Sequence, residues 1–140
     1  MAFHEKSAWI MTLALLIGGL FYFGLVVLIS NEMQQLAPPL LPLIVIYTII
    51  QIILAVVGHI LIAIWTPKEA NASLDERDRR INERAGHWSG YVIGIGVITS
   101  LGLYLFTRNG DLLFYAVFAS LMLSALAEYA SQIVLYRTRL

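Results

Sequence analysis

Four long runs of apolar residues dominate the chain, at about residues 8–29, 39–66, 87–107 and 112–136. About 20 consecutive apolar residues are enough to cross the hydrocarbon core of a bilayer as a helix. In lipid, only a helix or a closed barrel satisfies its own backbone hydrogen-bonding groups. The pattern therefore predicts an all-α integral membrane protein, with residues 1–140 forming a single domain, a bundle of four transmembrane helices.

The polar segment before the third apolar run predicts that the third helix extends out of the membrane. Pro67 ends the second helix, and Ser73 with Glu76 fits a capping box that starts a new one. No glycine or proline follows in the sequence until Gly86. We therefore expect one unbroken helix over residues 74–107, about 50 Å long, whose first turns lie in the cytoplasm.

Composition supports the membrane class and excludes several others. Hydrophobic residues make up 59% of the chain and charged residues 13%, against the roughly 25% charged that is typical of soluble domains. Nine Lys and Arg balance nine Asp and Glu, so net charge gives no indication of nucleic-acid binding. There is no cysteine, which excludes disulfides, thiolate metal sites and thiol nucleophiles.

The distribution of basic residues predicts the orientation of the helices. Only Arg108 lies on the side of the two short outer connections, and the other eight basic residues lie on the opposite side. These eight are Lys6, Lys68, Arg77, Arg79, Arg80, Arg84, Arg137 and Arg139. Trp9, Trp65 and Trp88 fall at that same interface. The positive-inside rule and the aromatic belt therefore place both termini in the cytoplasm.

The charged turns of the extended helix have three interpretations. They comprise Asp75, Glu76, Arg77, Asp78, Arg79, Arg80, Ile81 and Arg84. The first is a solvated helix that pairs with itself, Asp75 with Arg79 and Glu76 with Arg80. The second is a docking surface for another copy or a protein partner, since Leu74, Ile81 and Trp88 recur every seven residues. The third, a lipid-binding basic cluster, is disfavoured because acidic residues interleave with the arginines.

The same segment carries a resemblance to a known group of proteins. The run Asp75-Glu76-Arg77-Asp78, then Ile81, then Glu83-Arg84-Ala85-Gly86 leads straight into an apolar helix. Over about 35 residues it resembles the lead-in of small bacterial membrane proteins of unknown function, the DUF2178-like group. The resemblance implies a bacterial inner-membrane protein. It supplies no catalytic residues.

Polar residues within the spans line up on two helix faces. The fourth helix carries Ser120, Ser124, Glu128 and Gln132 at steps of four, and the second carries Gln51 and His59. Because a polar side chain facing lipid would lack a partner, both faces are expected to point inward. Glu128 and His59 lie about 12 and 9 Å from the expected cytoplasmic boundary, so we predict that they pair. The pair would serve as a packing anchor or as a centre for proton or cation handling.

Small residues predict close helix packing and self-association. Gly86, Gly90 and Gly94 recur at steps of four on the third helix, and Gly18 lies on the first. A further pattern suggests a parallel repeat of two-helix hairpins. A shift of 78 residues places Gly18 on Gly96, and a shift of 69 places Gln51 on Ser120 and His59 on Glu128.

These features favour a non-enzymatic interaction protein, an oligomeric bundle or accessory subunit that presents the charged helix to a cytoplasmic or membrane partner. The alternative is a small proton-coupled transporter or channel that uses Glu128 and His59. No cluster of nucleophile and base indicates an enzyme. The histidine spacing fits no zinc pattern, and nothing indicates a cofactor.

Overall fold

A computed structural model describes residues 3–67 and 75–138. These residues form the helices α1 (Phe3–Met33), α2 (Leu41–Trp65), α4 (Glu76–Thr107) and α5 (Gly110–Arg137), and no strand is found within them. Each of the four helices is long and apolar enough to cross a membrane. The predicted all-helical architecture with four candidate spans is confirmed.

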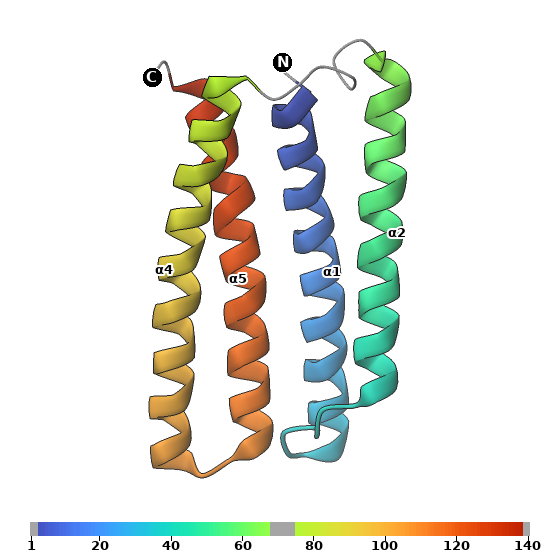
Figure 1. The fold of residues 1–140 in the computed structure, drawn as a ribbon. Coiled ribbons are helices and arrows are strands. Elements are labelled where there is room, and N and C mark those ends of the chain that lie inside the picture. The colour runs from blue at the N-terminus through green and yellow to red at the C-terminus, as the bar shows by residue number, and fades with distance from the viewer. Residues whose placement is uncertain (1–2, 68–74, 139–140) are drawn as a thin grey trace.

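The helices run side by side as two antiparallel hairpins (Figure 1). In the view of Figure 1 their order is α4, α5, α1, α2, and the extensive contacts join α4 to α5, α5 to α1 and α1 to α2. Hence α4 and α2 each pack mainly against one neighbour. The chain termini lie at the end of the molecule where α4 also begins (Figure 1). We call this the terminal end, and the opposite end the hairpin end.

The first turn of α4 differs from the expectation in its capping residues. The N-cap is Asp75, and the helix begins at Glu76, two residues later than predicted. The Asp78 amide donates to Asp75 Oδ1 at 2.7 Å, and the Asp75 amide donates to Asp78 Oδ2 at 3.4 Å. A carboxylate at the cap satisfies an amide that lacks a helical partner. The cap predicted at Ser73 lies outside the described residues.

The two connections at the hairpin end are fixed by local hydrogen bonds. Arg108 adopts a left-handed conformation with φ of 53° after α4, and Asn109 caps α5 by accepting from the Leu112 amide at 3.0 Å. In the longer connection, the Ala37 carbonyl accepts from the Tyr115 hydroxyl at 3.0 Å. This bond anchors the loop between α1 and α2 onto α5.

The buried core of the described residues joins α1, α2 and α5. It consists of Tyr22, Val26, Tyr47, Tyr115 and Met122. The Tyr22 ring lies 5.4 Å from the Tyr47 ring, edge to face, which is a favourable aromatic geometry. This cluster therefore lies between three helices, and the buried residues of α4, Ile81, Ala85 and Ser100, lie outside it.

Both termini are predicted to be cytoplasmic, and this expectation can be tested with topology reporters. A reporter that is active only in the periplasm should be silent when fused after residue 140 and active when fused after Asn109. The reason is the excess of Lys and Arg at the terminal end. Activity after residue 140 with silence after Asn109 would reverse the orientation.

Candidate functional site in the polar contacts of the helices

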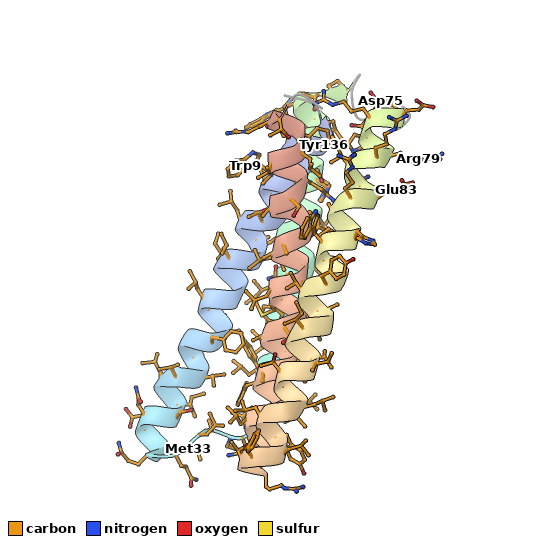
Figure 2. All side chains as sticks on the ribbon, turned by 90° about the vertical axis from the view of Figure 1, so that its left-hand side faces the viewer. Trp9, Met33, Asp75, Arg79, Glu83 and Tyr136 are labelled. Carbon is orange, nitrogen blue, oxygen red and sulfur yellow. The ribbon has the colours of Figure 1, made fainter. Side chains whose placement is uncertain are left out.

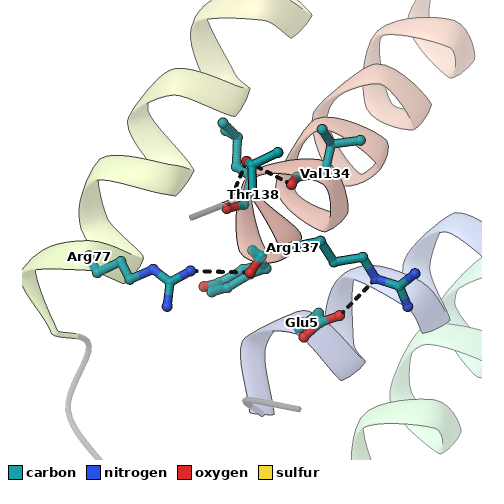
Figure 3. Close-up of polar contacts among 7 residues, drawn as sticks. Glu5, Arg77, Val134, Arg137 and Thr138 are labelled. Carbon is teal, nitrogen blue, oxygen red and sulfur yellow. Dashed lines mark hydrogen bonds and ion pairs between the residues drawn. The ribbon is translucent and has the colours of Figure 1, made fainter. Parts of the chain in front are cut away.

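Charged and aromatic side chains from three helices meet at the terminal end (Figures 2 and 3). We call this set the terminal cluster. It consists of Glu5 and Trp9 of α1, Arg77 and Asp78 of α4, and Tyr136 and Arg137 of α5.

Glu5 and Arg137 connect α1 to α5. Arg137 Nε donates to Glu5 Oε1 at 3.3 Å (Figure 3), and the Arg137 guanidinium lies 5.3 Å from the centre of the Trp9 ring. Glu5 is only 8% exposed, so its charge needs this partner. Glu5 also lies in the first turn of α1 and Arg137 in the last turn of α5. Both charges therefore complement the helix dipoles.

Tyr136 connects α5 to α4 through two hydrogen bonds. Its hydroxyl donates to Asp78 Oδ1 at 2.7 Å, and its carbonyl accepts from Arg77 Nη2 at 3.1 Å (Figure 3). That carbonyl is in the last turn of α5, where carbonyls lack a helical donor, so Arg77 supplies the missing bond. His4 Nε2 approaches Asp78 Oδ2 at 3.9 Å. The cluster thus joins the ends of three helices.

The charged turns of α4 pair with each other less than the sequence predicts. Arg80 and Glu76 form the expected ion pair at 3.7 Å. In the described part of the chain, Asp75 and Arg79 do not pair, because the Asp75 carboxylate accepts the capping bond instead. Figure 2 shows Arg79 and Glu83 projecting from the side of α4 that faces away from α5.

His59 bonds to α1, so the predicted pairing with Glu128 is wrong. The Ser7 hydroxyl lies 2.7 Å from His59 Nε2, and His59 Nδ1 lies 2.7 Å from the Ala55 carbonyl oxygen. The carbonyl can only accept, so Nδ1 carries a proton, and in the neutral ring Nε2 accepts from Ser7. A neutral His59 is fully satisfied in this way. Glu128 is half-buried and makes no hydrogen bond or ion pair with any residue the structure describes.

The other predicted intramembrane residues serve packing. Ser124 donates to the Ser89 carbonyl at 2.9 Å, which joins α5 to α4. Gln51 donates to the Tyr47 hydroxyl at 3.1 Å on its own helix, α2, and lies against Gly18. No hydrogen bond of Gln132 is found among the described residues. The small polar face of α5 is therefore mainly a surface for α4.

The glycines divide into covered and open positions. A Cβ added at Gly18 would meet Gln51, and one added at Gly96 would lie 2.6 Å from Ser120 Cβ. At Gly86, Gly90 and Gly94 an added Cβ would meet nothing within 4 Å of the described atoms. The predicted stripe on α4 therefore faces away from the packed interior.

Neither a metal site among the described residues nor a match to a known protein indicates a function for this chain. Within residues 3–67 and 75–138, no group of three His, Asp or Glu side chains is close enough to hold a metal ion. No family model, curated protein or solved structure matches this chain.

Proposed function

We propose that this chain is a non-enzymatic integral membrane subunit that self-associates through α4 and presents the charged first turns of α4 to a partner in the cytoplasm. The observation that carries this proposal is the open glycine stripe at Gly86, Gly90 and Gly94. As in the DUF2178-like group that the segment resembles, the membrane would be a bacterial inner membrane.

The packing of α4 supports the proposal. On this helix Ile81, Ala85 and Ser100 are buried, and the extensive contacts are made with α5 alone. Small residues allow helices to approach closely in lipid, as Gly96 does against Ser120 within the chain. A second copy of α4 could pack equally closely at Gly90, where no described residue covers the helix.

Gly90→Leu should weaken self-association about tenfold or more, roughly 1.4 kcal/mol, because the larger side chain holds two α4 helices apart. The thermal stability of the single chain should be unchanged, since the position is open. Single-molecule photobleaching in lipid bilayers measures the dimer fraction.

Gly24→Leu is the matched control, because Gly24 is equally open to an added Cβ but lies on α1, away from the stripe. It should leave the dimer fraction at the wild-type value. Equal dimer fractions for the wild type and Gly90→Leu would rule out the glycine stripe as the interface.

We also propose that the two hairpins are a parallel repeat. Under the shifts of 78 and 69 residues, Gly18 corresponds to Gly96 and Gln51 to Ser120. Gly18 lies against Gln51 in the first hairpin, and Gly96 lies against Ser120 in the second. Corresponding residues thus make corresponding contacts, which is what duplication of one hairpin would produce.

The alternative function is a small proton-coupled transporter or channel that uses Glu128 and His59. The absence of a bond to Glu128 among the described residues favours it. The two bonds of His59 count against it, because they go to Ser7 and Ala55 and do not join His59 to Glu128. We therefore prefer the interaction subunit.

A further inference from the structure

Three arginines of α4 line one hollow at the terminal end. The hollow has a volume of about 450 Å³, and its described lining residues are Glu76, Arg77, Arg80, Ile81 and Arg84. Residues three and four apart share a helix face, so the three guanidinium groups lie on the same side of α4. Ile81 is 2% exposed and provides an apolar floor.

The charges in this hollow are incompletely neutralised. Three arginines face one glutamate. The Glu76–Arg80 pair is weak, because its side chains are 91% and 76% exposed. Arg84 makes no hydrogen bond or ion pair with any described residue. An excess of positive charge with free donors is therefore available at Arg80 and Arg84.

The acidic residues that argue against a basic cluster in the sequence have other roles in the structure. Asp75 caps α4, and Asp78 accepts from both the Asp75 amide and the Tyr136 hydroxyl. Neither lines the hollow. Asp75 and Asp78 therefore do not offset the arginines of the hollow, and the acidic residues beside them are Glu76, in the hollow, and Glu83, which borders Arg84 in the next one.

Two further hollows adjoin the arginines, one along α4 and one between α4 and α5. Arg84 also borders a hollow of about 320 Å³, with Glu83, His87, Trp88 and Tyr91. Trp88 in turn borders a mainly apolar groove of about 300 Å³ between α4 and α5. The α5 residues of this groove are Ala127, Ala130, Ser131, Val134 and Leu135.

The aromatic residues place the arginines at the level of lipid headgroups. Trp88 is 61% exposed and Tyr91 is 56% exposed, as expected for side chains at a membrane interface. Arg84 lies one turn before Trp88, about 6 Å further from the membrane centre. Ile95 and Ile98 follow the aromatic pair along α4 and are also exposed, so they lie at the depth of the lipid hydrocarbon.

We propose that this surface binds one anionic phospholipid. Arg80 and Arg84 hold the phosphate, because the planar guanidinium fork matches phosphate oxygens. Trp88 and Tyr91 border the glycerol region, and the acyl chains continue along the exposed Ile95 and Ile98 below them. The excess positive charge selects an anionic headgroup and disfavours one that carries a cationic amine. This site is separate from the glycine stripe and does not depend on self-association.

The test is lipid binding to the detergent-purified full chain, measured by native mass spectrometry. Short-chain phosphatidylglycerol and phosphatidylcholine of equal chain length are titrated in parallel. We expect phosphatidylglycerol to bind at least about fivefold more tightly, and Arg84→Gln to remove most of that preference, since one basic residue near an anionic lipid contributes a factor of about five.

Arg79→Gln is the matched control. It removes the same charge from the same helix, five residues before Arg84, but Arg79 does not line the hollow. It should keep the preference for phosphatidylglycerol. An equal loss in both variants, or no preference in the wild type, would overturn the proposal. Inorganic phosphate that displaces phosphatidylglycerol at equal concentration would overturn the assignment to a lipid.

Discussion

Gly96→Leu should lower the free energy of unfolding by about 3 kcal/mol, the largest effect expected from a single substitution outside the terminal cluster. A Cβ at this position would lie 2.6 Å from Ser120 Cβ and 3.5 Å from Ser120 Cα. The second distance is an ordinary van der Waals contact, but the first involves Cβ, whose position the backbone of α5 fixes, so a side-chain rotation cannot relieve the crowding. The two helices would have to separate.

Separation matters here because α4 makes its extensive contacts only with α5. The effect can be measured by thermal unfolding in detergent, with Gly90→Leu as the control that adds the same atoms to an open position of α4. If both variants melted at the same temperature, the close approach at Gly96 would not contribute to stability.

The four spans could be predicted from the sequence because their length and apolarity are properties of the chain alone. The ends of the helices could be predicted less well. Ser73 with Glu76 satisfies the sequence pattern of a capping box, whereas Asp75 with Asp78, two residues later, departs from it at the third helical position, where Glu or Gln is usual. Only the geometry shows that Asp75 and Asp78 form one.

Contacts between helices could not be predicted, because sequence spacing gives the position of a residue along its helix but not its neighbours on other helices. Glycine spacing identified the stripe at Gly90 and Gly94, but it could not show that Gly96 is the covered position. The terminal cluster was missed for the same reason, since Glu5 and Arg137 are 132 residues apart. Their positions in a first and a last helical turn were the available signal.

The similar depths that the sequence predicts for Glu128 and His59 have an explanation in the proposed repeat. A shift of 69 residues places His59 on Glu128, and the shift of 78 places Ser7 on Ala85. Equivalent positions in two parallel hairpins lie at the same height without facing each other. His59 then bonds to Ser7 within its own hairpin, whereas Ala85, at the position equivalent to Ser7, has no side-chain hydroxyl to offer Glu128.

His59 and Ser7 should therefore show a coupling of about 1 kcal/mol in a double-mutant cycle of Ser7→Ala and His59→Ala. Each single variant leaves a polar group inside the protein without its partner, and such a group costs roughly 1–3 kcal/mol. The second substitution removes that group, so it should cost less than it does alone. Glu128→Gln with His59→Ala should be additive, because no bond joins these residues. Coupling of His59 to Glu128 with additivity toward Ser7 would restore the intramembrane pair, and a loss of proton flux into liposomes in Glu128→Gln would then favour the transporter.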